Sequence, residues 1–398
     1  MMWLIIDILD LVLFAIVALT VIYIVFYAIA STRYQRIETG ILRKHGRFLV
    51  ILTCHGQQPS IEDTIQSLLH QDYDSKDFDV LVSGFNLTPL QAIKLAQYPI
   101  HLLRATGRNF HKHKAHEYAV LQFQNMKIYD QIVFLDPGET VPTDFLSELN
   151  KVLQSGIRFC QLHRRQVSTP SHTSQIIATM EEINNSIFRK GHVAIGYPSA
   201  LAPSGYVIDY NWYKSHMRSN TSNDEIKGLE NQLLKERIFV DYVDEVCVFT
   251  PVVEHRSEIA DTRKEWIEGR LSSLFPHLRS LLPALFGFNF SLCDKILQWI
   301  MLPRIIMMGV IMLMSLILPF IYFTLAIKWW VLFLLVTFAF ALGTPDYLVD
   351  KEWTKSMLIF PVIFLQTGLR LLCQNPVVQK LVSLMKKGAT ALRSGKEE

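Results

Sequence analysis

The sequence predicts an α/β domain joined to α-helical membrane-spanning segments. Two observations carry this prediction. Half of the 398 residues are hydrophobic, and the longest uncharged stretches lie near the two ends of the chain. Between those ends, short apolar runs alternate with segments of helical periodicity. This alternation predicts a parallel, doubly wound sheet, which is an architecture common among nucleotide-binding proteins.

The composition of the chain argues against a nucleic-acid-binding protein and against a disulfide-rich protein. The net charge is only +3, so nothing indicates a nucleic-acid partner. The five cysteines are scattered and form no Cys-x-x-Cys pair. This usage fits a reducing compartment and argues against a disulfide scaffold.

The N-terminal region, 1–47, reads as a membrane anchor with a basic flank. Leu11 to Ser31 carries no charge and is long enough to span a bilayer. The start of the chain carries Asp7 and Asp10 rather than the basic residues of a cleavable signal peptide. The residues that follow the span include Arg33, Arg36, Arg43, Lys44 and Arg47. The positive-inside rule therefore predicts an N-terminus outside the cell and the next domain in the cytosol. Together with the apolar segments near the C-terminus, we expect a multi-pass protein of the inner (plasma) membrane.

The cytosolic domain is expected over 48–255. Strands are predicted at 48–54, 78–83, 100–104 and 131–135. Helices are predicted from 61, with Ser60 as N-cap, and at 90–97 and 111–124.

The strand predicted at 131–135 ends in an acidic turn. Asp136 follows the apolar run, Pro137 and Gly138 force a turn, and Glu139 comes next. Open α/β sheets bind ligands just beyond the carboxyl ends of their strands. Asp136 and Glu139 are therefore candidates to hold a divalent cation, Mg or Mn, against a diphosphate. Taken alone, the stretch fits a solvated acidic turn as well.

Six segments, in the expected order, resemble those of membrane-embedded family 2 glycosyltransferases, the group of the cellulose, chitin and hyaluronan synthases. They are the opening segment 53–73, the Lys-Ala pair within 112–115, the acidic segment 134–146, and the segments 203–208, 233–242 and 262–267. The resemblance covers roughly 48–270. It implies a GT-A fold, a nucleotide-sugar donor, inverting transfer to a glycan or lipid-linked acceptor, and a divalent cation. The donor-site positions it implies are Thr53, His55, Gly84, Lys114, Asp136 and Trp266, with Asp136 and Glu139 at the metal.

Several positions depart from the family pattern. Gly84 stands where the family has an Asp that contacts the base, and Gly138 replaces the second Asp of the DxD motif. Ile226 falls on the position of the catalytic base. In the last motif Thr262 replaces a Gln and Glu265 replaces an Arg, which reverses the charge where a leaving diphosphate should be neutralised.

Three acids near Ile226 are candidates for the base: Asp224, Glu225 and Glu230. Glu230 is expected on the same helical face as Ile226, one turn further on. Asp224 and Glu225 fit equally well as acids favoured at a helix start. Trp266 is a candidate aromatic platform for the acceptor sugar, or a side chain packed at the membrane interface.

The C-terminal part is predicted to return to the membrane. Interfacial amphipathic helices are expected over 256–303, and a membrane hairpin, a further interfacial helix and a basic cytosolic tail over 304–398. Ile305–Ile327 is a predicted span, and Lys328 separates it from a shorter apolar run, Trp329–Leu342. For Met357–Leu372 we favour an interfacial or re-entrant helix over a fourth span.

Two functions stay open. One is a membrane-bound hexosyltransferase that uses a nucleotide sugar to extend a cell-surface glycan or polysaccharide. The other is a catalytically degenerate relative that serves as a scaffold or partner subunit, because fold alone does not fix function. The expected partners are the donor, the glycan or lipid-linked acceptor, the bilayer and other membrane biosynthesis subunits, with no nucleic acid.

Overall fold

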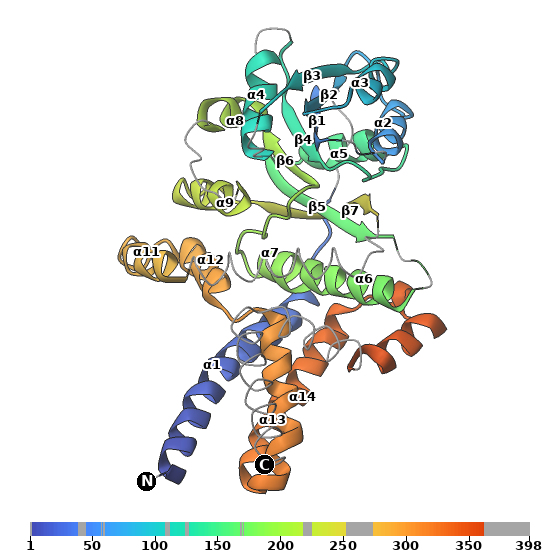
Figure 1. Cartoon of the computed structure of the whole chain (residues 1–398). Coiled ribbons are helices and arrows are strands. Elements are labelled where there is room, and N and C mark those ends of the chain that lie inside the picture. The colour runs from blue at the N-terminus through green and yellow to red at the C-terminus, as the bar shows by residue number, and fades with distance from the viewer. Residues whose placement is uncertain are drawn as a thin grey trace, which may run out of the picture.

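A single sheet organises the upper part of the molecule in the computed structural model (Figure 1). The structure describes residues 2–38, 45–56, 58, 60–107, 112–123, 127–167, 169, 171–217, 225–251 and 274–361. The strands are β1 (Phe48–His55), β2 (Phe78–Phe85), β3 (His101–Ala105), β4 (Gln131–Leu135), β5 (Phe159–Gln166), β6 (Tyr206–Asp209) and β7 (Asp241–Thr250).

The sheet is mixed rather than wholly parallel. Its strand order is β3-β2-β1-β4-β6-β5-β7. Strands β1 to β4 pair in parallel, as predicted. The prediction is wrong for β6, which runs antiparallel to both β4 and β5. The helices between β5 and β6 lie below the sheet, near the end of β5, so the chain re-enters the sheet from that end (Figure 1).

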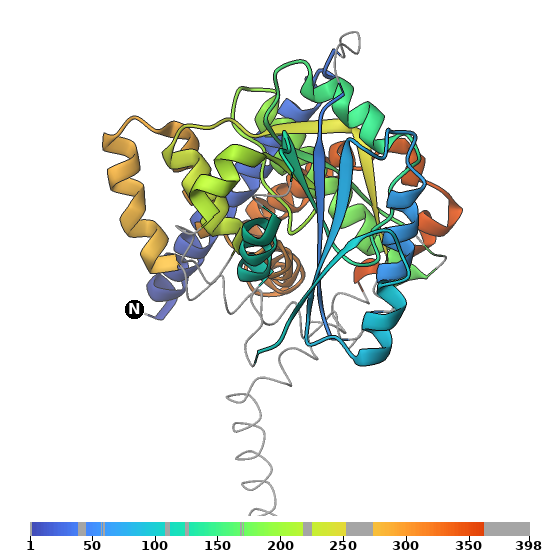
Figure 2. The same cartoon turned by 90° about the horizontal axis from the view of Figure 1, so that it is seen from above.

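The helices of this domain are α2 (Ile61–Leu69), α3 (Pro89–Leu95), α4 (Lys112–Phe123), α5 (Phe145–Leu153), α6 (His172–Asn184), the π-helix η1 (Asn185–Lys190), α7 (Gly191–Val193), α8 (Tyr210–His216) and α9 (Glu225–Lys235). Helices α2 and α5 bury apolar side chains such as Ile65 and Leu149 against one face of the sheet. Helices α4, α8 and α9 cover the other face with side chains such as Val120 and Leu233. The view from above shows the sheet between these two groups (Figure 2). The result is an α/β domain with helices on both faces.

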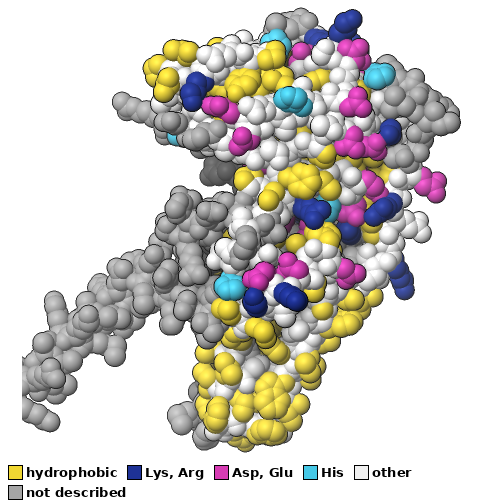
Figure 3. All heavy atoms as spheres, turned by 90° about the vertical axis from the view of Figure 1, so that its right-hand side faces the viewer, with side chains coloured by type: hydrophobic (Ala, Val, Ile, Leu, Met, Phe, Trp, Pro, Cys, Tyr) yellow, Lys and Arg dark blue, Asp and Glu magenta, His cyan; other side chains and the backbone are white. Residues whose placement is uncertain are grey.

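Among the described residues, three helices are long and apolar enough to cross a membrane: Asp7–Ser31 within α1 (Met2–Ser31), α13 (Arg304–Ile321) and α14 (Phe323–Gly343). Hydrophobic side chains cover the lower part of the molecule, where these helices lie, and charged ones gather above (Figure 3). The hairpin breaks at Tyr322, so the prediction that Lys328 separates the two spans is wrong.

Lys328 lies inside α14, where its charge is paired with an acidic side chain of α1. Its ammonium is paired with the carboxylate of Asp10 on α1, which is 8% exposed. The indole Nε1–H of Trp329 donates to the other oxygen of Asp10 at 2.9 Å. Ionisable groups inside a membrane segment are tolerated when they pair with one another. The pair therefore joins the first span to the third.

The π-helix η1 and α7 lie crosswise between the sheet and the spans (Figure 1). At Gly191 a Cβ atom would lie 2.3 Å from the backbone oxygen of Tyr27 on α1, so only glycine fits this approach. Beside α9 are α11 (Leu274–Phe286) and α12 (Phe290–Ile300), in the region predicted as interfacial helices. The first part of that region, 256–273, lies outside the described residues.

Candidate functional site

Asp136 lies directly after β4, at the edge of the sheet where the acidic turn was predicted. The Nζ of Lys112 donates to Asp136 Oδ1 at 2.5 Å and to the carbonyl oxygen of Pro203 at 2.8 Å. Both side chains remain partly exposed, at 25% for Lys112 and 33% for Asp136. The carboxylate and its ammonium partner are therefore open to a ligand at this edge.

Glu139 is turned inward. It is 1% exposed, and its Oε1 accepts hydrogen bonds from Ser204 at 2.6 Å and from Arg164 at 3.2 Å. Its Oε2 accepts the backbone N–H of Asp136 at 2.8 Å. Both oxygens are thus engaged by the protein. The residue fixes the turn that presents Asp136.

The ends of β1 and β2 lie beside this turn. The hydroxyl of Thr53 is buried and has no hydrogen-bond partner among the described residues. His55 is exposed at the end of β1, and its ring stacks on that of Phe85 with the ring centroids 6.2 Å apart. Gly84 is packed under Leu87, whose Cδ1 would lie 2.3 Å from an added Cβ. A larger side chain at this position would require the Leu87 side chain to move aside.

The other positions of the predicted site are placed as follows. Lys114 is exposed on α4, and Lys112 rather than Lys114 contacts Asp136. Asp224 and Trp266 lie outside the described residues, and Glu225 begins α9 with a side chain that is not described.

A cavity of about 460 Å³ lies between the α/β domain, α1 and α12. Two of its lining residues reach the acidic turn: Arg164 contacts Glu139, and the carbonyl of Pro203 accepts from Lys112. Ile226 and Glu230, one turn apart on α9, also line it. The cavity therefore adjoins the neighbours of Asp136 and also Ile226, the position at which the resemblance predicts the catalytic base.

Glu230 is buried and paired. Its Oε1 accepts from Lys295 Nζ at 3.0 Å and from the backbone N–H of Leu201 at 2.8 Å. Lys295 is itself only 2% exposed. An ion pair this deeply buried is stable only with complete hydrogen bonding. It ties α9 to α12 and to the loop before β6.

A second group of charges lines the same cavity. Glu181 Oε1 lies 3.1 Å from Arg189 Nη1 and 3.6 Å from Arg164 Nη1. Burial alone would raise the pKa of Glu181, but the guanidinium groups of Arg189 and Arg164 outweigh it and lower the pKa to about 2. Glu181 is therefore ionised at neutral pH.

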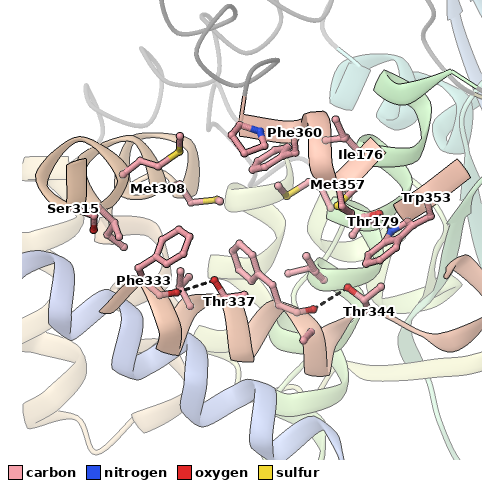
Figure 4. Close-up of a pocket in the computed structure, with 18 of the residues that line it drawn as sticks. Ile176, Thr179, Met308, Ser315, Phe333, Thr337, Thr344, Trp353, Met357 and Phe360 are labelled. Atoms are coloured by element: carbon pink, nitrogen blue, oxygen red, sulfur yellow. Dashed lines mark hydrogen bonds between the residues drawn. The ribbon is translucent and has the colours of Figure 1, made fainter. Parts of the chain in front are cut away.

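A larger pocket, about 620 Å³, lies between α6, α13, α14 and the helix 351–361 (Figure 4). Phe333, Met308 and Met357 point into it, and the indole of Trp353 donates to the Thr179 hydroxyl at 2.9 Å. None of the described residues that line it is charged. A charged donor does not fit such surroundings.

Asp136 suits a divalent cation better than Glu139 does. Mg²⁺ is commonly held by one or two carboxylates together with substrate phosphates. Asp136 is accessible enough to supply one such ligand. Glu139 is saturated by protein donors, and no group of three His, Cys, Asp or Glu that could hold a metal gathers in the described part of the chain.

Sequence reasoning missed Lys112, Arg164, Arg189 and Lys295. The Lys-Ala segment pointed to the right stretch of α4, but two lysines two positions apart face different ways on a helix, and the sequence does not say which faces the sheet edge. The other three lie on β5, η1 and α12, and only the folded chain brings them to one cavity.

Comparisons with known proteins found solved structures with a partial likeness in fold. Mannosyltransferase PcManGT from Pyrobaculum calidifontis, in complex with GDP-Man and Mn²⁺, has 13% identity and a TM-score of 0.49 over 83% of this chain and 99% of that one. S. aureus TarS has 12% identity and a TM-score of 0.35 over 52% of this chain and 37% of its own. TarS 1–349 in complex with UDP-GlcNAc has 13% identity and a TM-score of 0.38 over 53% and 60%. No family model and no curated protein matches the sequence.

Proposed function

We propose that the protein is a membrane-bound, inverting glycosyltransferase of family 2 with a GT-A fold. It transfers a hexosyl group from a nucleotide-sugar donor to a glycan or lipid-linked acceptor of the cell surface. The observation that carries the proposal is the Lys112–Asp136 pair at the end of β4, next to a cavity lined by charged side chains. The order of the six sequence segments supports it.

The roles follow from position. The diphosphate of the donor binds at the carboxyl end of β4, where the Lys112 ammonium offsets its negative charge. Asp136 holds a divalent cation that, when bound, stabilises the leaving nucleoside diphosphate. Thr53 and His55, at the end of β1, face the nucleoside, and the buried Thr53 hydroxyl gains the partner it lacks among the described residues. Glu139 holds the turn.

The acceptor lies on the other side of this turn, in the cavity that Pro203 and Arg164 line. Among the three candidate bases, Glu230 is the one whose side chain is described, and it faces this cavity. Its pairing with Lys295 makes it a positioning residue for the wall of the acceptor site rather than a free base.

Nucleotide binding tests the donor site. Calorimetry on the full chain in detergent, with UDP and GDP and with Mn²⁺, is expected to show binding that Asp136→Asn abolishes. Lys112→Gln should weaken binding about tenfold, since it removes a charged partner of the phosphates. Lys114→Gln, on the same helix, is the matched control and should bind normally. The same loss in both lysine variants would reject the assignment of Lys112.

The scaffold alternative has an observation of its own. Gly84 supplies no carboxylate at the position where the resemblance places an acid that contacts the nucleotide base. If neither UDP nor GDP binds the wild-type protein with Mn²⁺ present, the transferase proposal fails and the scaffold function takes its place.

A further inference from the structure

An apolar groove lies between the two C-terminal spans, at the pocket of about 620 Å³ described above (Figure 4). Its wall on α14 is a stripe at helical spacing that begins at Trp330, includes Phe333 and ends at Thr344, the C-cap. On α13 a shorter stripe, from Met308 to Leu316, forms the facing wall. At a rise of about 1.5 Å per residue, the stripe on α14 is ~21 Å long. The groove therefore runs along both helices.

The position of the groove along the spans decides which lipid layer it meets. Both helices are among the described ones that are long and apolar enough to cross a membrane. The groove starts near the N-terminal end of α13 and the C-terminal end of α14, where α6 and the helix 351–361 also line it. This end lies next to the α/β domain, and in the orientation predicted from the sequence it is the cytosolic end (Figure 1). One leaflet contributes ~15 Å of hydrocarbon, so the groove is long enough for a lipid chain of that leaflet.

Most polar side chains of this wall already have partners within the protein. The hydroxyls of Thr337 and Thr344 each donate to the carbonyl oxygen four residues earlier, at 2.8 Å. The indole N–H groups of Trp330 and Trp353 donate to other residues of the wall, at 3.0 and 2.9 Å. Ser315 differs, because its hydroxyl has no hydrogen-bond partner among the described residues. Buried water needs about two to four polar partners, so a wall of this kind does not favour water.

The groove is accessible and its wall suits hydrocarbon. Leu316 and Phe333 line it and are nevertheless 58% and 42% exposed, so molecules outside the protein reach this wall. None of the described lining residues is charged, and a charged group would lose its hydration there without gaining a partner. Folded proteins contain few voids larger than a water molecule, because unfilled apolar space is destabilising. An apolar chain is therefore the occupant that this wall favours.

We propose that this groove holds one acyl chain of a phospholipid of the cytosolic leaflet as a bound component of the protein. The bilayer that the spans cross supplies such chains at the groove. The groove lies on a different face of α6 from the cavity beside Asp136. Met180 and Ile183 line the groove. Glu181 and Asn184 line the cavity. The lipid is thus a partner of the membrane part of the chain rather than the sugar acceptor, and the inference does not rest on the transferase proposal.

Photocrosslinking in the full chain tests the proposal. The photoreactive residue p-benzoylphenylalanine replaces Phe333, which points into the groove (Figure 4). The matched control carries it in place of Phe338, which is 50% exposed on the same helix and is not part of the groove. The protein is irradiated in cells or after washing in lipid-free detergent, and mass spectrometry identifies the attached molecule. After washing, the phospholipid adduct at position 333 should exceed that at 338 by about tenfold or more, because only a bound chain resists exchange with detergent.

Other adducts at position 333 identify other occupants. A peptide from residues 362–398 would mean that the C-terminal segment of the same chain fills the groove. A peptide from a second copy would mean that the groove is a contact between two chains, and a polyisoprenoid would mean a different class of lipid. Each of these results overturns the proposal. So do equal phospholipid yields at positions 333 and 338 after washing, or no adduct at 333.

A variant that fills the groove locates the chain. Ala341→Trp adds an indole to the wall and should lower the phospholipid adduct at position 333 about tenfold, since the ring takes the space of the chain. Leu334→Trp, at a position on the same helix that is 67% exposed and outside the groove, should leave the yield unchanged. The melting temperature shows whether both variants fold. An unchanged yield in folded Ala341→Trp would reject the site, and if this variant does not fold, the comparison of positions 333 and 338 decides.

Discussion

At Gly191 the backbone of the domain packs tightly against the backbone of the first span. An added Cβ would lie 2.3 Å from the backbone oxygen of Tyr27, and backbone cannot move aside as a flexible side chain can. At Gly343 of α14, by contrast, a Cβ would meet Ile183 and Ser186 at 3.5 Å, which is ordinary contact. Two helical glycines at the same interface thus differ in what they tolerate.

We therefore expect Gly191→Ala to destabilise the protein by about 1–3 kcal/mol through overpacking. Gly343→Ala is the matched control and should be neutral or slightly stabilising, since alanine favours a helix. Thermal unfolding in detergent compares the two. If both variants melt at the wild-type temperature, α1 does not pack against α7 as described.

Glu181 is a second single residue with a testable effect: it makes the stability of the folded protein depend on pH. Its pKa is about 2 in the folded protein, below its usual value of 4.5, because Arg189 and Arg164 outweigh the effect of burial. A carboxylate with a lowered pKa stabilises the folded state above its unfolded pKa and loses that contribution as the pH falls.

Glu181→Gln should accordingly be less stable than wild type by about 1–3 kcal/mol at pH 7, since it leaves two guanidinium groups without their anion. The difference in melting temperature between the two proteins should shrink as the pH falls from 4.5 towards 2. A difference that stays constant over that range would contradict the role given to Glu181.

At the scale of elements, the pair between Asp10 and Lys328 links α1 to α14. Breaking a buried pair by removing one partner leaves the other charge uncompensated. Asp10→Asn and Lys328→Met should each destabilise the protein by on the order of 2 kcal/mol or more.

A double-mutant cycle checks this link. The variant with both substitutions should recover most of the loss, because no charge is then left unpaired in the span. Asp7→Asn, on an exposed position of the same helix, should have little effect. Additive losses in the double variant would show that the two side chains do not interact.

The elements also show what the sequence alone can and cannot specify. Strands β1 to β4 were predicted within a few residues because each is a short, largely apolar run bounded by turn residues. Strand β5, which pairs in parallel with β7, was not predicted. The antiparallel direction of β6 was not predicted, since the direction of a strand depends on where the chain re-enters the sheet. The end of α13 was misplaced because Lys328 was taken for a boundary, and its partner lies 318 positions away.

The sequence likewise predicts one part of the candidate site and not the other. Asp136 was found because it is local to a strand end. The cavity was not predicted, because its lining residues come from α1, α9, α12, η1 and the loop before β6. No single segment of the sequence contains enough of them to indicate a cavity. The resemblance pointed to Ile226 as the position of the catalytic base, and the structure places Ile226 in the wall of this cavity.

At the scale of the whole molecule, we predict an outside N-terminus and a cytosolic domain. The spans Asp7–Ser31, Arg304–Ile321 and Phe323–Gly343 fit this orientation, together with the basic residues that follow the first span. An impermeant thiol reagent applied to intact cells should label Met2→Cys and miss Asp144→Cys, which should react only after the membrane is permeabilised. The reverse pattern would contradict the orientation.

The central claim is that Asp136 belongs to a working sugar-transfer site. The most direct measurement is release of nucleoside diphosphate from UDP- and GDP-sugars by the purified full chain, with Mn²⁺ present. Wild type and Asp144→Asn, an exposed acid after the same turn, should release it, and Asp136→Asn should be slower by about 10²-fold or more. Release at equal rates by Asp136→Asn and wild type, or no release by either, would contradict the account.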